Sequence, residues 1–370
     1  MRIVLFYHSL ISDWNHGNAH FLRGVAGELI ARGHDLRIFE PRDGWSLRSL
    51  LAEQGPAAID RFQRAYPGLR STFYDPAAID LDEALDGADL VVVHEWNPPE
   101  LVGRIGQHRA RSRGYRLLFH DTHHRSVTAP EEMARYDLAH YDGVLAYGRV
   151  IRDLYLSRGW AAAAWTWHEA ADTRLFRPIE GKREGDLVWI GNWGDNERTE
   201  ELHTFLLEPV KALGLNARVH GVRYPEEGRR ALAEAGIGYA GWLPNDEVPE
   251  VFARFRVTVH IPRRPYVRAL PGIPTIRPFE ALACGIPLIS APWEDREALF
   301  TPGADFLVAR TGEEMKRHLK MLLNDRSSAE ALAAHGRVTI LARHTCAHRV
   351  DQLLTIFASL NLPEEKEVPA

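Results

Sequence analysis

The chain has 370 residues, a formal net charge of −5 at pH 7 and a hydrophobic content of 45%. This length predicts about two domains, and the composition is that of a folded globular protein rather than a disordered one. The negative net charge argues against a nucleic-acid partner held by broad charge neutralisation. The 2 cysteines are too few for a disulfide framework or a cysteine-based zinc site.

The first residues, MRIVLFYHS, form a short apolar run that continues into polar, His-rich sequence. This run lacks the small-residue cleavage site of a signal peptide and is typical of a first β-strand. No apolar stretch reaches the ~20 residues needed to cross a bilayer. We therefore expect a soluble cytoplasmic protein without an integral membrane segment.

Short apolar runs alternate with helical patterns in the first half of the chain. The expected strands are residues 3–7, 35–40, 89–95, 115–121 and 143–147. Between the first two runs, apolar residues recur with the 3.6-residue period of a helix; they are Leu22, Val25, Ala26, Leu29 and Ile30. Strands with little polar alternation are covered on both faces, which predicts a parallel sheet with crossover helices.

The same pattern restarts after the polar stretch 181–186. The further expected strands are residues 186–193, 216–222, 237–243, 257–261 and 286–290, and the sequence after 312 is helical. We predict an α/β protein of two Rossmann-like, doubly wound domains that face each other across a cleft. The expected division is 1–172, 173–345 and 346–370, where the last segment is a helix that returns to the first domain, followed by a frayed tail. Ligands of such sheets bind outside the carboxyl ends of the strands.

The stretch PGIPTIRPFEALACGIPLIS (271–290) combines a turn with one short helix. Thr275 is the expected N-cap, and Ile276 and Arg277 lie in the first turn. The free amides of that turn and the helix dipole make an anion site. Glu280 can accept hydrogen bonds from the vicinal hydroxyls of a ribose. The alternative is an acidic residue placed favourably near a helix start, with Arg277 solvated.

The segment RPFEALACGIPLIS (277–290) resembles the donor-binding segment of GT-B glycosyltransferases. Four further segments are similar to parts of CgeB-like, spore-maturation glycosyltransferases and keep their order along most of the chain. They are VVHEWN (92–97), FHDTHHRS (119–126), WHEAADTRLFRP (167–178) and HTCAHRVDQLL (344–354). The resemblance implies the GT-B fold, a nucleoside-diphosphate sugar as donor with a UDP-sugar favoured, and contact of Glu280 with the ribose.

The sequence departs from the family pattern at Gly272. Many retaining GT-B enzymes carry a second Glu eight residues before the ribose Glu, and that position is Gly272 here. The loop around Gly272 and Ile273 is therefore expected to offer backbone amides to the sugar or phosphate. The stereochemical outcome stays open.

Two further groups are candidates for binding the diphosphate. In WIGNWGDNER (189–198), a strand ends at Gly191, Asn192 and Trp193, where the backbone can approach a phosphate closely, and Arg198 follows. Arg263, directly after the strand 257–261, is a rival for the role of Arg198. The alternative in both cases is a turn with surface cations.

Candidate catalytic residues follow two strands of the first half. In HDTHH (120–124), Asp121 or His123 can act as the general base that deprotonates an acceptor hydroxyl. The same cluster can instead hold a metal ion or cap the loop. His16, after the first strand, is a second base candidate.

The remaining candidates are expected to line the sugar and acceptor side of the cleft. Gly17 and Asn18 open the first helix, and Glu95 and Trp96 end a strand, with Trp96 able to stack on a sugar ring. His168 and Glu169, near the domain boundary, can reach the sugar. Turn formation, helix capping and packing between domains are the alternatives.

Together these patterns predict a glycosyltransferase that transfers a sugar from a nucleoside-diphosphate sugar to an unknown acceptor. No DxD-type pair stands where a nucleotide-bound metal is expected, so we expect a metal-independent enzyme with no cofactor beyond the nucleotide sugar. The open alternatives are a non-catalytic protein of the same fold that binds nucleotide or glycan, and a nucleotide-sugar epimerase.

Overall fold

The computed structural model describes residues 1–112 and 114–360. The amino-terminal lobe is built on a parallel sheet with the order β3-β2-β1-β4-β5-β6-β7. Its strands are β1 (Arg2–Phe6), β2 (Asp35–Pro41), β3 (Thr72–Tyr74), β4 (Leu90–His94), β5 (Arg116–Asp121), β6 (Gly143–Ala146) and β7 (Ala164–Thr166). This is the doubly wound arrangement, in which the strand order reverses beside β1.

Helices cover both faces of this sheet. They are α1 (Asn18–Ala31), α2 (Trp45–Gln54), α3 (Ala57–Ala65), α4 (Leu81–Ala84), α5 (Pro99–Ser112), α6 (Arg125–Thr128), α7 (Pro130–Met133) and α8 (Arg149–Ser157). The apolar face of α1 packs with Leu22 and Val25 in one core cluster, whereas α5 packs with Leu101 and Ile105 in the cluster on the other face. Strands between two such clusters need apolar residues on both sides, which explains their continuous apolar runs.

The carboxyl-terminal lobe repeats this plan, with the parallel order β10-β9-β8-β11-β12-β13. Its strands are β8 (Gly185–Ile190), β9 (Ala217–His220), β10 (Ile237–Tyr239), β11 (Phe255–His260), β12 (Leu288–Ser290) and β13 (Leu307–Val308). Its helical segments are α9 (Thr199–Leu202), a π-helical turn (His203–Leu207), α10 (Glu208–Leu213), α11 (Glu226–Glu234), a 3-10 turn (Asn245–Glu247), α12 (Val248–Ala253), α13 (Arg264–Arg268), α14 (Ile276–Ala283), α15 (Gly312–Asn324) and α16 (Arg326–Arg343). The two doubly wound units that the sequence predicts are thus both present.

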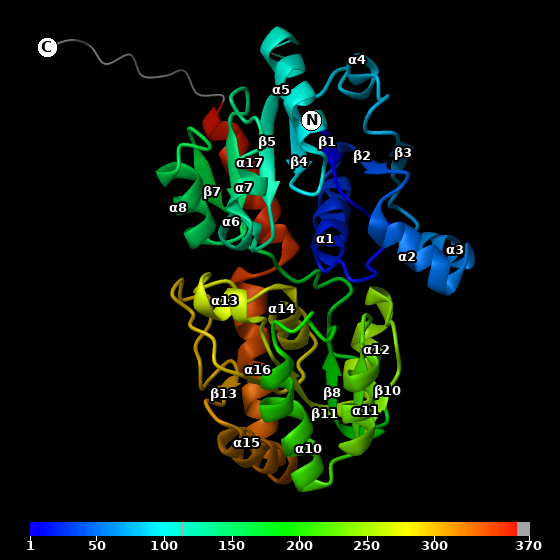
Figure 1. Ribbon diagram of the computed structural model, residues 1–370, viewed down its shortest axis with the longest axis vertical. Helices are drawn as coiled ribbons and strands as arrows, with labels where there is room; N and C mark the ends of the chain where they lie inside the picture. The colour runs from blue at the N-terminus through cyan, green and yellow to red at the C-terminus, as the bar shows by residue number, and fades with distance from the viewer. Residues whose placement is uncertain (113, 361–370) are drawn as a thin grey trace, which may run out of the picture.

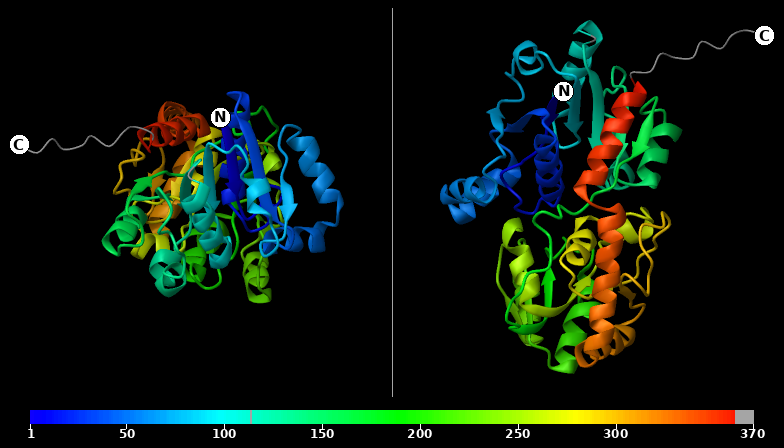
Figure 2. Two further views of the ribbon diagram at one scale, coloured as in Figure 1. Left: turned by 90° about the horizontal axis from the view of Figure 1, so that it is seen from above. Right: turned by 180° about the vertical axis from the view of Figure 1, so that it is seen from behind.

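The chain crosses between the lobes twice, and the last helix, α17 (Cys346–Leu360), lies beside the amino-terminal lobe (Figures 1 and 2). Val350 and Leu353 of α17 belong to the same core cluster as α1. The indole Nε1 of Trp167 donates to the carbonyl of Arg349 at 2.8 Å, which ties the first crossing to α17. The expected frayed tail, 361–370, lies outside the described residues.

The lobes stand one above the other, with the carboxyl ends of β1, β4, β5, β8 and β11 directed toward the space between them (Figure 1). The loops after these strands supply much of the surface that the next section describes. Among the described residues, no helix is long and apolar enough to cross a membrane.

Candidate functional site

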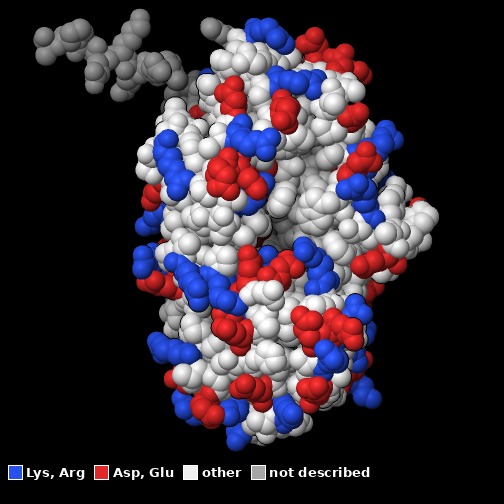
Figure 3. All heavy atoms as spheres, viewed as in Figure 1, with Lys and Arg blue, Asp and Glu red and all other residues white. Residues whose placement is uncertain are grey.

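A cavity of about 520 Å³ lies between the two lobes. Figure 3 shows it as a hollow with uncharged side chains above it and charged side chains along its lower rim. The predicted site residues that line it are His16, Gly17, Asn18, Trp96, His123, Glu169, Gly191, Asn192, Arg198, Arg263, Thr275, Ile276 and Arg277. Those that do not line it are Glu95, Asp121, His168, Trp193, Gly272, Ile273 and Glu280.

Two guanidinium groups meet on Asn192 in the carboxyl-terminal wall of the cavity. The side-chain oxygen of Asn192 accepts from Arg198 at 2.6 Å and from Arg263 at 3.2 Å. Arg198 also donates to the carbonyls of Asn192 and Ile261 but has no carboxylate partner among the described residues, whereas Arg263 pairs with Glu197 at 3.1 Å. Burial, and then the charge of Arg263, lower the pKa of Arg198 to about 9, so it stays charged at neutral pH. This part of the wall therefore carries excess positive charge.

The start of α14 adds backbone donors to the same wall. Thr275 precedes the helix with φ 60 and makes no side-chain cap, so the amides of Ile276 and Arg277 have no acceptor among the described residues. A β-branched residue rarely adopts positive φ, and the surrounding structure must hold it there. Because the helix dipole also points its positive end here, this helix start suits an anion, as the sequence predicts.

Glu280 differs from its predicted place. Its side chain is fully buried, and both carboxylate oxygens are occupied. Oε1 lies 2.6 Å from Nδ1 of His20 and 3.3 Å from Nδ2 of Asn245, and Oε2 accepts from Arg277 at 2.5 Å. In this structure Glu280 therefore acts on the cavity by holding Arg277 rather than by presenting its own oxygens.

The amides of Gly272 and Ile273 are also not available to a ligand. The amide of Gly272 donates to the carbonyl of Glu294 at 2.8 Å, and that of Ile273 to Leu270 at 3.3 Å. Trp193 instead packs in the core of the carboxyl-terminal lobe, where its ring contacts Gly228. None of these three residues lines the cavity.

In the amino-terminal wall, several polar groups lack partners. Asn18 is 6% exposed, and neither its amide nitrogen nor its amide oxygen has a partner among the described residues. Nε2 of His16, which is 5% exposed, is also unpartnered. Burial holds the pKa of His16 well below its ordinary range, so the ring is neutral. Buried polar atoms without partners are rare, and a bound ligand is one way to satisfy them.

Only part of the HDTHH segment (120–124) reaches the cavity. His123 and His124 line the cavity with their ring centroids 4.0 Å apart, and burial lowers the pKa of both, in His124 to about 4. Asp121 is fully buried beneath them and accepts from the Tyr155 hydroxyl at 3.0 Å and from the amide of His123 at 3.1 Å. A carboxylate in that place cannot take a proton from a ligand in the cavity. In this structure Asp121 lies under the cavity and holds the amide of His123, whereas its predicted role as a base requires contact with the ligand.

Glu95 is likewise buried, whereas its neighbour Trp96 lines the cavity. Glu95 pairs with Arg125, whose guanidinium lies 4.2 Å from the centre of the Trp96 ring. Glu95 thus fixes the indole through Arg125. This explains why one residue of the pair reaches the cavity and the other does not.

Of the two predicted residues in the first crossing, His168 and Glu169, only Glu169 lines the cavity. His168 lies 2.9 Å from Glu297 and does not line the cavity. Glu169 is 7% exposed and lines it, with no side-chain hydrogen bond or ion pair among the described residues. Burial, and then the charge of Glu280, raise the pKa of Glu169 to about 8. Its carboxyl is therefore largely protonated at neutral pH.

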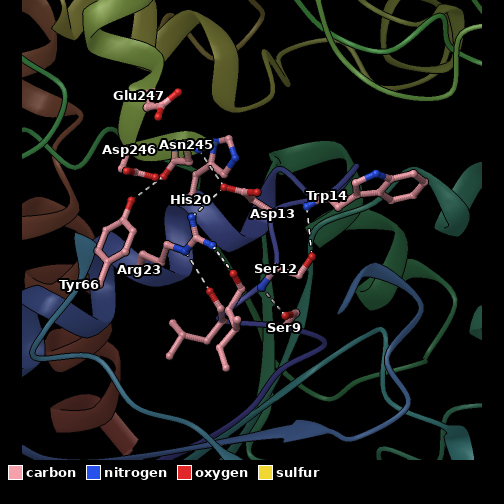
Figure 4. Close-up of polar contacts among 12 residues, drawn as sticks. Ser9, Ser12, Asp13, Trp14, His20, Arg23, Tyr66, Asn245, Asp246 and Glu247 are labelled. Carbon is pink, nitrogen blue, oxygen red and sulfur yellow. Dashed lines mark hydrogen bonds and ion pairs between the residues drawn. The ribbon is translucent and has the colours of Figure 1, made fainter. Parts of the chain in front are cut away.

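A network between the lobes, shown in Figure 4, lies at one side of the cavity and was not foreseen from the sequence. Asp13 accepts from Arg23 at 2.9 Å, from the amide of Asn245 at 2.9 Å and from the indole of Trp242 at 3.1 Å. The Tyr66 hydroxyl donates to the side chain of Asn245 at 3.1 Å. The bonds from Asp13 to Trp242 and Asn245 join segments more than 200 residues apart, and no local motif marks them.

Other lining residues also escaped prediction; they are Asn15, His20, Trp45, Tyr147, Arg223 and Trp242. Trp45 begins α2, a few residues after β2 ends at Pro41. Within residues 1–112 and 114–360, no group of three His, Cys, Asp or Glu side chains is arranged to hold a metal ion. The HDTHH residues, in particular, do not converge on one point.

Comparisons with solved structures identify the architecture. An alpha-glucosyltransferase in complex with UDP and DNA containing a HMU base is similar over 97% of this chain and 99% of its own, with a TM-score of 0.72 and 11% identity. Anabaena Alr3699/HepE in complex with UDP and glucose is similar over 97% and 100%, with a TM-score of 0.67 and 14% identity. Sucrose-phosphate synthase from Thermosynechococcus elongatus is similar over 97% of this chain and 99% of its own, with a TM-score of 0.63 and 16% identity. The chain has the GT-B fold.

The GT-B fold, predicted from the sequence resemblance, is thus confirmed over nearly the whole chain. A family model described as "Glycosyl transferase-like" matches residues 198–355, which begin at Arg198 and include α14. No curated protein matches the chain. In this GT-B chain the matched region supplies Arg263, Arg277 and the open helix start of the cavity.

Proposed function

We propose that the protein is a glycosyltransferase that uses a UDP-sugar as donor. The asymmetry of the cavity carries this proposal. One wall holds Arg198, Arg263 and Arg277 beside the open amides of α14, which is the chemistry that binds a diphosphate. The opposite wall offers neutral imidazoles, which suit a hydroxyl group that must lose a proton. UDP in the structurally similar HepE and alpha-glucosyltransferase supports the choice of nucleotide.

In the proposed reaction, the bond from the anomeric carbon to the diphosphate breaks and a bond from that carbon to the acceptor oxygen forms. Negative charge grows on the leaving oxygen of the nucleoside diphosphate. The guanidiniums of Arg198 and Arg263, already fixed by Asn192, stabilise that charge without reorganising. His16 or His123 accepts the proton of the acceptor hydroxyl. The protonated Glu169 donates a hydrogen bond to the sugar. Closure of the lobes around the donor excludes water that would otherwise hydrolyse it.

We also propose that the reaction needs no divalent metal ion, because the guanidinium groups supply the positive charge that a cation provides in other enzymes. Turnover should then be unchanged by EDTA. Activity that EDTA abolishes and magnesium or manganese restores would contradict this part of the proposal. The CgeB-like subtype and the cytoplasmic location remain predictions from the sequence.

The test begins with binding of UDP to the full chain, followed by hydrolysis of UDP-glucose. Replacement of Arg263 by Ala should weaken UDP binding by about 10- to 100-fold, since one charge-assisted hydrogen bond contributes about 1.5–3 kcal/mol. Arg264→Ala is the matched control. Arg264 is the next residue in the chain, pairs with Glu201 at 3.2 Å, and does not line the cavity. Its removal should change the Kd by less than about 3-fold.

The outcomes separate the alternatives. UDP binding with hydrolysis of UDP-glucose supports the glycosyltransferase. UDP binding without donor cleavage under any condition favours the non-catalytic nucleotide-binding protein. Absence of UDP binding, or equal effects of Arg263→Ala and Arg264→Ala, removes the basis of the proposal.

A further inference from the structure

The amino-terminal wall of the cavity presents two indole rings. Trp45 and Trp96 both line the cavity, both are half-buried, and their ring centroids lie 6.0 Å apart in an edge-to-face arrangement. They come from different elements, because Trp45 begins α2 and Trp96 follows β4. The fold therefore brings together, on one surface, two large aromatic residues that the sequence separates by about 50 positions.

Other side chains hold both indoles in place. The guanidinium of Arg125 lies 4.2 Å from the centre of the Trp96 ring and is itself anchored to the buried Glu95. The ring of His8 stacks on Trp45 with a centroid distance of 4.7 Å. An aromatic surface that is fixed before binding loses little conformational entropy when a ligand packs on it.

Polar groups without partners lie on the same wall. Both amide atoms of the buried Asn18 are unpartnered, as is Nε2 of the buried His16. An amide offers two donors and one acceptor, and a neutral imidazole offers one of each. These groups match the hydroxyls of a ligand whose apolar face lies on the indoles.

Charge separates the two walls of the cavity. The cationic residues that line it are Arg198, Arg223, Arg263 and Arg277, all in the carboxyl-terminal lobe. No Lys or Arg of the described amino-terminal lobe lines the cavity, and its titratable lining groups there are acids and imidazoles. The pKa values of His16, His123 and His124 are lowered by burial, so these rings are neutral. A phosphate group placed on this wall would find no Lys or Arg among the lining residues, and Arg125, which lies on the Trp96 ring, is already paired with Glu95.

We propose that the acceptor is an uncharged glycoside whose pyranose ring lies on Trp45 and Trp96 and whose hydroxyls bond to Asn18 and His16. This inference rests on the proposed glycosyltransferase function and specifies its acceptor. A pyranose has apolar C–H faces and equatorial hydroxyls, which matches fixed indoles rimmed by amide and imidazole groups. Sugar phosphates and nucleic acids, whose phosphates need cations, do not match this wall.

The test measures binding by saturation-transfer NMR in the presence of saturating UDP, with three probes. They are a set of methyl hexopyranosides, glucose 6-phosphate and a single-stranded oligonucleotide. Methyl glycosides should bind, and Trp96→Ala should weaken that binding by about 10-fold, the loss expected for one aromatic contact. Trp160→Ala is the matched control, because Trp160 is half-buried in the same lobe beneath Arg158 at 4.8 Å but does not line the cavity.

Trp45→Ala is a second, independent variant in case Trp96→Ala does not fold, and the UDP affinity of each variant reports its integrity. Absence of glycoside binding, tighter binding of glucose 6-phosphate or the oligonucleotide, or equal losses in Trp96→Ala and Trp160→Ala would overturn the inference. Failure of the proposed function shows itself separately, as absence of UDP binding in the wild-type protein. The glycoside result can still be read in that case, by repeating the titration without nucleotide.

Discussion

His20 in α1 and Glu280 in α14 are joined across the two lobes, with 2.6 Å between Nδ1 and Oε1. The same carboxylate accepts from Arg277 at 2.5 Å, and both of its partners, His20 and Arg277, line the cavity. Glu280 is completely buried, and these partners occupy both of its carboxylate oxygens. One acid therefore links the contact between the lobes to the orientation of a guanidinium that faces the ligand space.

This arrangement predicts that Glu280→Gln weakens binding of UDP and of inorganic pyrophosphate by similar factors of about 10, because Arg277 loses its anchor. It should also lower the free energy of unfolding by about 2 kcal/mol, since a hydrogen-bonded charge is removed from a buried site. Isothermal titration with both ligands and urea unfolding measure the two effects. Glu330→Gln, which alters an exposed ion pair in α16, is the control. A loss confined to UDP would instead reveal direct contact of Glu280 with the ribose.

The base is predicted to be one of two histidines. His16→Gln or His123→Gln should lower kcat by about 100-fold or more, the usual contribution of general-base catalysis, while the Kd for UDP stays within about 3-fold. The variant with the larger loss identifies the base. Asp121→Asn should lower kcat by less than about 10-fold, because Asp121 only positions the amide of His123. Losses below about 3-fold in both histidine variants would place the base elsewhere.

The helices and strands of the fold could be predicted because the spacing of apolar residues along the sequence indicates them. Runs such as residues 90–93 have apolar side chains on both faces, and this pattern is typical of strands covered on both sides. The start of α14 was also predictable, since Thr275 and Pro278 mark a helix N-terminus locally. The sequence does not specify side-chain directions in loops. Asp121 and His123 are two residues apart, yet one lies under the cavity and the other on it.

Partners that are distant in sequence were equally beyond prediction. The partner of Glu280 is 260 positions away in α1, and the amide of Gly272 finds the carbonyl of Glu294 only because the intervening helix and strand return the chain to it. Such contacts depend on tertiary packing, which predictions from short stretches of sequence do not include. Trp45 shows the same limit, because a tryptophan at a helix start is in itself typical of core packing.

Stability should fall as the pH rises from about 7.5 to 8.5. Burial raises the pKa of Glu169 and of Asp121 to about 8, so the folded protein retains protons that the unfolded chain releases. Each such group lowers the free energy of unfolding by up to about 1.4 kcal/mol per pH unit in this window. Below about pH 7.5 the trend is opposed. Buried histidines such as His120 and His260, with pKa values lowered to about 3, stay neutral there while the unfolded chain binds protons.

Urea unfolding at several pH values measures this slope. Glu169→Gln should reduce it between about pH 7.5 and 8.5, and the double replacement of Glu169 and Asp121 should reduce it further. Glu330→Gln, at an exposed site, should leave the slope unchanged. An unaltered slope in Glu169→Gln would show that the carboxyl of Glu169 is ionised in the folded protein.

Replacement by Ala should have opposite effects at two helical glycines, Gly24 at the contact between α1 and α17 and Gly103 in α5. A Cβ at Gly24 would overlap the thiol of Cys346 in α17 and would lie 2.8 Å from Cβ of Asp172, whereas a Cβ at Gly103 in α5 would lie 4.0 Å from its nearest neighbour. Gly24→Ala should therefore destabilise the protein by about 1–3 kcal/mol and speed hydrogen exchange in α17, because overpacking displaces that helix. Gly103→Ala should stabilise by about 0.5–1 kcal/mol through reduced freedom of the unfolded chain. If Gly24→Ala also stabilised the protein and left exchange in α17 unchanged, α17 would not pack on α1 in solution as it does here.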